Sequence, residues 1–440
     1  MSKSAIIDSE SIVEVSSLDS EYNSVCNMSA KDGNTHYTSS SYKTLEVLGP
    51  EHEFSVVDEQ LRPLPIVDEL LKQLSGRFRN NVAFPDFALG KELQKHVLEL
   101  KAVTPFRSPI NFEETMQRAV LKVYDILEKN DARLLGLGMH PTLSLDEALV
   151  WNHRDRRIYE AFDKIFNLKQ HGWLNIQSFQ LNIPYGNEAE AVQLYNLIAG
   201  VLPYLPAISA SSPVYESKFG EYVDNRLRYY SVNQAAIPSI AGEIIPEPIT
   251  SFETYRNLTI RRYSRDLTKV NAPNYIINKE WINSRGAIIR FDRKAIEIRI
   301  MDEQECIKSD VAFSCFIRSL LRGLIQSSDA ASKVIGLPHA VLVNRFNAVI
   351  KNGLNAKMGH EGLTARDVCR RLCRIAYENA SEEERIYLPI VNKRVENGNL
   401  SEIISKHIQK RMQRTDVEEA IINIYSLLAE KLRINEVYEG

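Results

Sequence analysis

The sequence predicts an α+β fold, in which helices flank a mainly antiparallel sheet and a helical region follows it. The first observation is a set of three strand-like segments, 45–54, 179–183 and 295–300, in which polar and apolar residues alternate. Successive side chains of a strand point to opposite faces, so each segment has one face that can pack on a core. The second observation is the helical periodicity that dominates from Asp310 onward.

The chain divides into three predicted regions. Residues 1–43 are rich in Ser, Asn, Asp and Tyr without sustained periodicity, which predicts a disordered N-terminal tail. We expect a main domain over residues 44–330 and a helical C-terminal region over residues 331–440 that packs on it.

Capping patterns and periodicity place individual elements. Asn111 and Glu114 form a capping-box-like pattern that predicts a helix beginning at Asn111. Thr415 and Glu418 form the same pattern before the last helix. The segment 288–300 is typical of a hairpin that turns near Asp292. Further strands are predicted at 96–103 and 134–138, and further helices at 65–74, 154–166 and 189–201.

Composition excludes several classes of protein. With 440 residues and a net charge of −3, the chain lacks the charge excess of proteins that bind nucleic acids or membrane surfaces. Its longest apolar region, 191–214, is interrupted by prolines and amides, so we expect a buried helix there and no membrane span. Five cysteines without paired CxxC elements, and no basic-then-apolar leader, favour a cytoplasmic protein with reduced thiols. The sequence leaves open whether the protein forms a homo-oligomer.

The polar faces of the three strand segments predict a site. Each carries two polar residues at positions i and i+2, which emerge about 6.5–7 Å apart on one side. Carboxylates that gather in this way repel one another unless protons or cations intervene, and oxygen-rich clusters suit Mg²⁺. A sheet with one solvent-exposed face would show the same alternation. The absence of Lys, Ser and Thr from these positions argues against this alternative. The residues are Glu51, Glu53, Gln180, Asn182, Glu297 and Arg299.

Several phosphate-binding and hydrolase motifs are missing from the sequence. There is no GxxxxGK[ST] loop, and Gly136-Leu137-Gly138 lacks the third glycine of a dinucleotide fingerprint. HExxH and GxSxG are missing as well. A bound nucleotide would therefore be held by metal-bridged carboxylates and arginines, without a glycine loop.

Six short segments, in order along the chain, resemble the motifs of one family. They are 48–54 (LGPEHEF), 138–141 (GMHP), 179–183 (FQLNI), 205–213 (LPAISASSP), 225–226 (NR) and 295–302 (AIEIRIMD). Together they resemble the glutamate–cysteine ligase family, including the carboxylate–amine ligases of its second class. This resemblance implies a glutamine-synthetase-like catalytic fold with a funnel-like active-site floor, over residues 44–330.

The resemblance also implies an activity and roles for residues. It implies a ligase that uses ATP and Mg²⁺, with Mn²⁺ as an alternative, to join an amino-acid carboxylate such as glutamate to an amine such as cysteine through an acyl phosphate. The implied catalytic residues are Glu51, Glu297 and Arg299, the implied metal ligands are Glu51, Glu53, Glu92, Glu99 and Glu297, and the implied substrate-binding residues are Gln180, Asn182 and Arg226.

The sequence leaves alternatives open for several residues and for the function. Glu92 can be a solvated surface charge, and either arginine can belong to a surface salt bridge. Gln180 stands where the family often has a histidine, which leaves the amine acceptor open. A non-catalytic or regulatory relative, or a metal-dependent γ-glutamyl amide hydrolase, would carry the same motifs.

Overall fold

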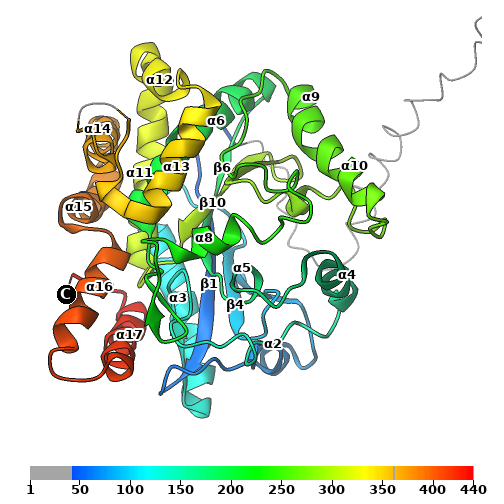
Figure 1. The fold of residues 1–440 in the computed structure, drawn as a ribbon, viewed down its shortest axis with the longest axis vertical. Coiled ribbons are helices and arrows are strands. Elements are labelled where there is room, and N and C mark those ends of the chain that lie inside the picture. The colour runs from blue at the N-terminus through cyan, green and yellow to red at the C-terminus, as the bar shows by residue number, and fades with distance from the viewer. Residues whose placement is uncertain (1–41, 360–361, 440) are drawn as a thin grey trace, which may run out of the picture. The chain divides into compact units, whose positions relative to one another are not determined.

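The computed structural model describes residues 42–359 and 362–439. The predicted tail therefore lies outside the described residues, except for Tyr42 and Lys43. The described chain confirms the predicted α+β class: one large antiparallel sheet is flanked by helices, and the C-terminal part is helical. In Figure 1 the strands run through the middle of the view, with α11, α14 and α15 on one side and α4, α9 and α10 on the other.

The large sheet has eight strands in the order β2-β3-β4-β1-β6-β10-β9, and β5 pairs with the far end of β1. A separate two-stranded ribbon is formed by β7 (Val214–Tyr215) and β8 (Lys218–Phe219). The strands of the large sheet are β1 (Gly49–Asp58), β2 (Asn81–Ala83), β3 (Phe87–Lys91), β4 (Val97–Ala102), β5 (Ala132–Leu135), β6 (Ser178–Pro184), β9 (Ala287–Arg290) and β10 (Ala295–Asp302).

The strand register decides which side chains share a face. Glu51 on β1 is opposite Gln180 on β6, and Asn182 on β6 is opposite Glu297 on β10. Directly opposed residues of an antiparallel pair project on the same side, so these four polar groups face one way. The intervening apolar residues point to the other face, which is buried. The predicted separation of a polar and an apolar face is therefore present.

Helices cover the apolar face. α11 packs behind β6, α3 behind β3, β4 and β5, and α6 behind β9 and β10. The longer helices are α2 (Val67–Ser75), α3 (Pro109–Leu127), α4 (Arg156–Phe166), α6 (Glu188–Val201), α10 (Arg261–Lys269), α11 (Ile307–Gln326), α12 (Ser328–Ile335), α13 (His339–Asn352), α14 (Ala365–Glu378), α15 (Glu382–Asn397), α16 (Leu400–Arg411) and α17 (Val417–Ile434). The shorter ones are α5 (His171–Leu174), α7 (Leu205–Ser209), α8 (Asn225–Tyr230), α9 (Phe252–Tyr255), η2 (Glu128–Asn130), η3 (Leu202–Tyr204), η4 (Arg256–Ile260), η5 (Glu280–Ile282) and η6 (Gly353–Asn355).

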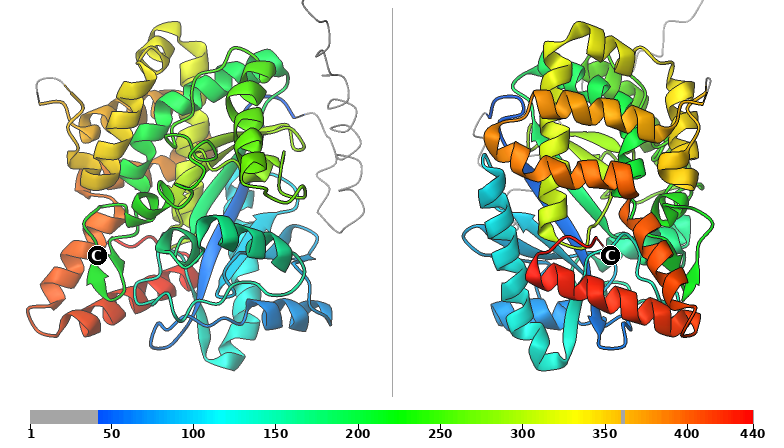
Figure 2. Two further views of the ribbon diagram at one scale, coloured as in Figure 1. Left: turned by 45° about the vertical axis from the view of Figure 1, so that its right-hand side comes forward. Right: turned by 90° about the vertical axis from the view of Figure 1, so that its left-hand side faces the viewer.

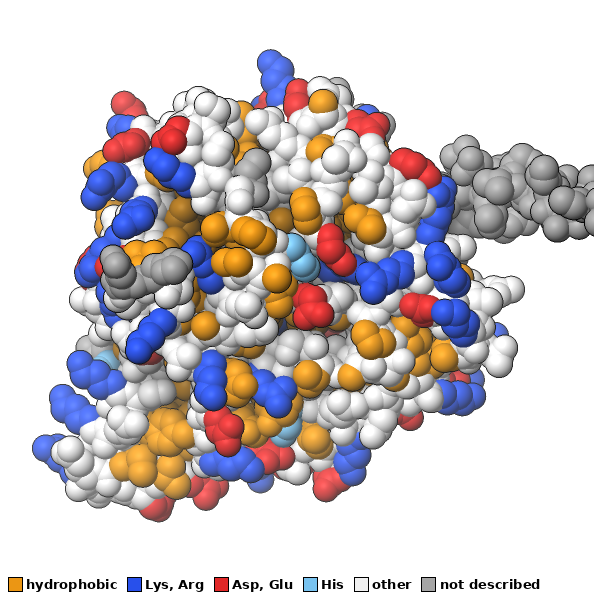
Figure 3. All heavy atoms as spheres, turned by 45° about the horizontal axis from the view of Figure 1, so that its top comes forward, with side chains coloured by type: hydrophobic (Ala, Val, Ile, Leu, Met, Phe, Trp, Pro, Cys, Tyr) orange, Lys and Arg blue, Asp and Glu red, His pale blue; other side chains and the backbone are white. Residues whose placement is uncertain are grey.

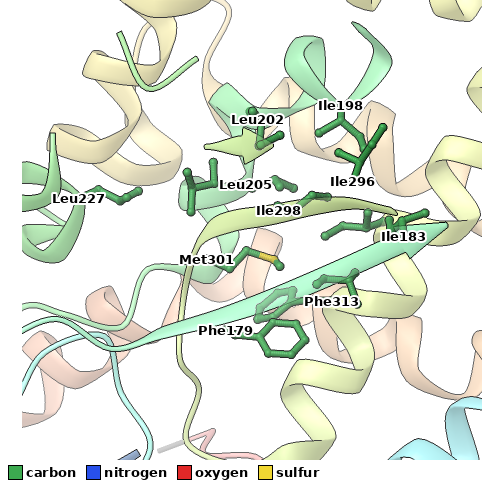
Figure 4. Close-up of a cluster of buried hydrophobic side chains, with 14 of the residues drawn as sticks. Phe179, Ile183, Ile198, Leu202, Leu205, Leu227, Ile296, Ile298, Met301 and Phe313 are labelled. Carbon is green, nitrogen blue, oxygen red and sulfur yellow. The ribbon is translucent and has the colours of Figure 1, made fainter. Parts of the chain in front are cut away.

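The main hydrophobic core lies between this face and the helices. Figure 4 shows Phe179 and Ile183 of β6, Ile296 of β10, Ile198 of α6 and Phe313 of α11 in one cluster. Side chains from both sides of residue 330 join the same cluster. The subdivision at residue 330 stays a prediction. In the right panel of Figure 2, α14 to α17 follow one another across the side that faces the viewer.

Two helix starts differ from the predicted ones. α3 begins at Pro109, and its N-cap is Ser108, whose hydroxyl accepts a hydrogen bond from the Asn111 N–H. The last helix is capped by Asp416 and not by Thr415. A serine or aspartate just outside the first turn satisfies an orphan N–H there, and proline suits the first helical position.

The predicted buried apolar helix is confirmed. Among the described residues, one segment, Glu188–Ser209, is long and apolar enough to cross a membrane, but 83% of its apolar window is buried inside the protein. It comprises α6, η3 and α7 and belongs to the core. On the face shown in Figure 3, acidic and basic side chains are interspersed over the surface.

Candidate active site

Glu51 lies near the centre of the polar face and is surrounded by donors. Asn182 Nδ2 donates a hydrogen bond of 3.0 Å to Glu51 Oε1, and the Arg293 guanidinium pairs with the same oxygen. Burial alone would raise the pKa of Glu51, but the charges of Arg293 and Lys101 outweigh it and hold this pKa well below its usual range. Glu51 is therefore an anion that already has counter-ions.

Glu53, two residues along β1, is in the opposite electrostatic situation. Gln180 Nε2 donates to Glu53 Oε1 at 2.9 Å, and the Ser178 N–H donates to Glu53 Oε2 at 2.7 Å. Burial nevertheless raises the pKa of Glu53 to about 7, and the charge of Glu99, directly opposite on β4, adds to this. Glu53 is thus a carboxylate without enough positive charge around it.

Glu297 forms ion pairs with two arginines. Arg290 Nη1 lies 2.5 Å from Glu297 Oε2, and Arg299 Nε lies 2.9 Å from Glu297 Oε1. Arg299 Nη1 also donates to the Asn283 carbonyl at 2.8 Å, which fixes the plane of the guanidinium. The guanidinium of Arg299 is therefore held in a fixed position on the polar face, and it does not belong to a surface salt bridge.

Glu92 and Glu99 complete the acidic part of the site. Glu99 pairs with Lys101 at 2.5 Å, and Glu92 follows β3 at the pocket described below. Burial raises the pKa of Glu92 well above its usual range, as do the charges of Glu53 and Glu99. Glu92 is half-buried and lines the same pocket as Glu53, so its place among the metal ligands stays a prediction.

A glycine on the neighbouring strand makes room for Glu99. Gly90 on β3 is opposite Glu99, and a Cβ atom added to Gly90 would lie 2.6 Å from Glu99 Oε2. Any larger residue at position 90 would have to displace this carboxylate.

A pocket of about 410 Å³ opens on this polar face. Its polar part is formed by Glu53, Glu92, Gln180, Arg226 and Arg299. The remaining wall combines apolar and aromatic side chains with further polar ones; the former include Ile158, Tyr159, Phe162, Trp173, Tyr230 and Trp281, and the latter include Lys91, Gln94, Asp155, Asn233 and Gln234. A concave site with apolar walls and a few convergent charged groups is the usual form of a small-molecule site.

Arg226 reaches the pocket from the first turn of α8 and is held from behind. Its Nε donates to Asp302 Oδ1 at 2.6 Å, whereas its Nη2 has no hydrogen-bond partner among the described residues. Asp302 also accepts hydrogen bonds from the Ser211 N–H at 2.8 Å and from Ser212 Oγ at 2.7 Å. Ser211 Oγ in turn accepts from the Gly138 N–H at 2.8 Å. Three of the other sequence motifs therefore meet behind this one guanidinium.

Sequence reasoning missed four charged residues of the site: Lys101, Arg290, Arg293 and Asp302. Lys101 follows Glu99 at i+2, so strand alternation could have predicted that Lys101 lies on the same face as Glu99. Arg290 and Arg293 lie on either side of the predicted hairpin turn, and only the strand pairing shows that they reach Glu297 and Glu51. Asp302 stands at the end of a motif that was recognised without assigning it a role.

Comparison with known protein families identifies the chain. Residues 47–422 match the family described as Glutamate-cysteine ligase family 2 (GCS2). The chain belongs to this family. The resemblance inferred from the six motifs is thereby confirmed, and the family is one of ATP-dependent carboxylate–amine ligases.

Relatives of this GCS2-family chain include archaeal and bacterial proteins. It is 45% identical over 392 residues to an uncharacterised protein of Archaeoglobus fulgidus, covering 89% of this chain and 100% of the relative. It is 24% identical over 368 residues to the "Putative glutamate–cysteine ligase 2-1" of Rubrobacter xylanophilus, covering 80% and 86%.

Two solved structures share the fold. The glutamate–cysteine ligase of Francisella tularensis in complex with AMP aligns with a TM-score of 0.56 at 13% identity, covering 91% of both chains. The bifunctional glutathione synthetase of Pasteurella multocida aligns with a TM-score of 0.52 at 14% identity and covers 89% of this chain. This GCS2-family chain spans about half of that bifunctional protein, 52% of its length.

Proposed function

We propose that the protein is a cytoplasmic ligase that uses ATP and Mg²⁺ to join an amino-acid carboxylate, in the first instance glutamate, to an amine. The observation that carries this proposal is the position of Arg226. Arg226 lines the same pocket as Glu53, Glu92 and Arg299, and its buried Nη2 has no hydrogen-bond partner in the described part of the chain. A guanidinium that is fixed by Asp302 and still has a free donor suits a substrate carboxylate.

The donor set fits magnesium. Mg²⁺ prefers carboxylate oxygens together with substrate phosphates, and this face offers Glu51, Glu53, Glu99 and Glu297, with Glu92 beside them. The raised pKa of Glu53 and of Glu92 means that these carboxylates lack positive charge, which bound cations would supply. When bound, the metal would neutralise phosphate charge during phosphoryl transfer.

Residues of the chain would bind the substrates and position them for the reaction. Arg226 holds the α-carboxylate of the amino acid and so directs its side-chain carboxylate toward the carboxylate cluster. That side-chain carboxylate attacks the γ-phosphate of ATP, which gives an acyl phosphate and ADP. Arg299 lies in the same pocket and can pair with the transferred phosphoryl group. The amine then displaces phosphate and forms the amide.

The apolar wall of the pocket indicates which amines could serve as the acceptor substrate. Phe162, Trp173 and Trp281 give part of this wall an aromatic surface, beside the polar side chains of Asn233 and Gln234. The wall favours amines with an apolar or aromatic body, and cysteine is the smallest acceptor to test. Panels of amines should therefore include arylalkylamines and aromatic amino acids beside cysteine.

The decisive experiment measures release of ADP with ATP and with each substrate alone or in pairs. A ligase releases ADP in proportion to amide only when both the carboxylate and the amine are present. A hydrolase would cleave γ-glutamyl amides without ATP, and a regulatory relative would do neither. Glu51→Gln serves as the inactive control. Failure of every carboxylate–amine pair, with the protein folded and binding ATP, would refute the proposal.

A further inference from the structure

A second cluster of ligand-type side chains lies on the opposite, buried face of the same strand. His52 stands between Glu51 and Glu53 on β1 and points away from them. Glu303 follows β10 directly, and Asp310 lies in the first turn of α11. The side chains of all three residues are fully buried, with no exposed area.

The distances within this cluster suit a shared ion. His52 Nδ1 lies 3.2 Å from Glu303 Oε1 and 3.3 Å from Asp310 Oδ2, and one ligand atom of each residue lies within 4.8 Å of the others. Ligands held at 2.0–2.1 Å around a tetrahedral ion lie about 3.3 Å apart. The imidazole ring is oriented by Phe54, Phe112 and Phe179, whose centroids lie 5.0–6.0 Å from its own.

The second observation is that the charges of the cluster are not compensated. Within the described part of the chain, no donor group makes a hydrogen bond of regular geometry to either oxygen of Asp310, although both oxygens are buried. Among the described residues, neither Glu303 nor Asp310 has an ion pair with lysine or arginine. Two other buried carboxylates nearby do: Asp302 pairs with Arg226, and Glu305 pairs with Arg394 at 2.5 Å.

Two buried carboxylates beside one imidazole need either protons or a cation, because isolated charges are expensive inside a protein. His52 supplies at most one positive charge, so a single cation bound by all three residues would compensate the two carboxylates more fully than the imidazole alone.

We propose that His52, Glu303 and Asp310 hold a divalent transition-metal ion, of the Zn²⁺ or Mn²⁺ type, separate from the metals of the active site. One imidazole nitrogen and carboxylate oxygens suit these ions, whereas Mg²⁺ prefers oxygen ligands alone.

The ion would tie β1 to the β10–α11 connection directly beneath the active site. Glu303 contributes to both sides of the strand, because its Oε2 accepts a hydrogen bond of 3.0 Å from the Glu53 N–H while its Oε1 faces His52. The metal is therefore structural and also positions the strand that carries Glu51 and Glu53. This inference does not depend on the proposed ligase activity.

The test is the metal content of the full-length protein after dialysis against a chelator. Because the site has no exposed area, the ion enters during folding and should resist chelation, whereas magnesium of the active site should be removed. We expect about one transition-metal ion per chain in the wild type. The Glu51→Gln/Glu297→Gln double variant, which alters only the active-site face, should keep it. Asp310→Asn, which is nearly isosteric, should lose it.

If Asp310→Asn does not fold, refolding of the wild type replaces it as the test. Wild-type protein refolded with Zn²⁺ or with Mn²⁺ should melt at a higher temperature than protein refolded with chelator, since a ligand that binds only the native state stabilises it. Refolding with Co²⁺ should give d–d absorption bands that the Asp310→Asn variant lacks. Wild-type protein that folds equally well without metal and retains none after refolding would overturn the proposal. Retention of the ion by folded Asp310→Asn would overturn it as well.

Discussion

Arg226 and Asp302 form a buried ion pair in which the arginine Nε donates to the aspartate Oδ1 at 2.6 Å. Both side chains are almost fully buried, with 2% and 0% exposure. The pair has two functions that can be separated. It neutralises a carboxylate that would otherwise be isolated in the core, and it fixes an arginine that lines the pocket.

The first prediction concerns this arginine. Arg226→Ala should lower stability by about 3–5 kcal/mol, because it leaves Asp302 buried without its counter-ion. Arg226→Lys keeps a positive charge but loses the planar fork, so the protein should stay folded. We expect Arg226→Lys to raise KM for the carboxylate substrate at least about 30-fold, corresponding to 2 kcal/mol or more, with KM for ATP little changed.

A matched control separates binding from stability. The Arg226→Met/Asp302→Asn double variant removes both charges of the pair, so it should recover much of the stability that Arg226→Ala loses while still failing to bind the carboxylate substrate. Chemical denaturation and steady-state kinetics measure the two effects. If Arg226→Lys weakened ATP alone, Arg226 would be a phosphate contact and Arg299 would take its place at the carboxylate.

The second prediction compares the two glutamates of β1. Glu51→Gln should lower turnover by at least about 10²–10³-fold, a typical loss when a charge-stabilising group is removed. It should also destabilise the metal-free protein, because Arg293 and Lys101 lose their shared counter-ion. Glu53→Gln should be equally inactive but should raise the melting temperature of metal-free protein above pH 7. Equal melting temperatures for the two variants would contradict this difference.

The sign of the Glu53 effect follows from its pKa. The folded pKa of about 7 lies above the ordinary value of a glutamate, so the folded state holds a proton that the unfolded state releases. This contribution to stability is present below the unfolded pKa and is lost as the pH rises through about 7. The wild type without metal should therefore lose stability between about pH 4.5 and pH 8, and Glu53→Gln should lose less.

The polar and apolar faces of β1, β6 and β10 could be predicted from the sequence, because strand alternation needs only local spacing. The pairs across the strands could not be. Arg293 reaches Glu51 over 242 positions, and Asp302 reaches Arg226 over 76, so both contacts depend on tertiary packing and not on local spacing. The predicted start of α3 was wrong for a different reason: more than one residue near Asn111 can cap a helix, and Ser108 does so directly before Pro109.

The third prediction concerns Glu384, which joins α15 to α11. Burial would raise its pKa, but hydrogen bonds from Arg322 and the charge of Arg318 lower it to about 2. Arg318 Nε lies 2.6 Å from Glu384 Oε1, and Arg322 Nη1 lies 2.9 Å from Glu384 Oε2. Because the folded pKa lies below the unfolded value, the stabilisation is present above about pH 4.5 and is lost as the pH falls toward 2.

Glu384→Gln should therefore cost about 3–5 kcal/mol at neutral pH, the usual effect of removing one partner from a buried ion pair. Its stability should also depend less on pH between about pH 5 and pH 2 than that of the wild type. Urea denaturation at several pH values measures both effects. Glu396→Gln is the control, because Glu396 forms an exposed pair with Arg370 and its loss should change stability by less than about 1 kcal/mol.

The last prediction concerns Gly90, where the absence of a side chain leaves room for the Glu99 carboxylate. In Gly90→Ala the new Cβ would meet Glu99 Oε2 at 2.6 Å, so the carboxylate has to move. Displacement of one ligand-orienting group commonly weakens metal binding by about 10–100-fold, and we expect a loss of this size in Mg²⁺ affinity, measured by titration calorimetry. Glu99→Gln should give a similar loss. Because both changes act through the same carboxylate, the double variant should bind Mg²⁺ no more weakly than Glu99→Gln alone. Additive losses would show that Gly90 acts on the site by another route, and unchanged affinity in both single variants would remove Glu99 from the metal-binding face.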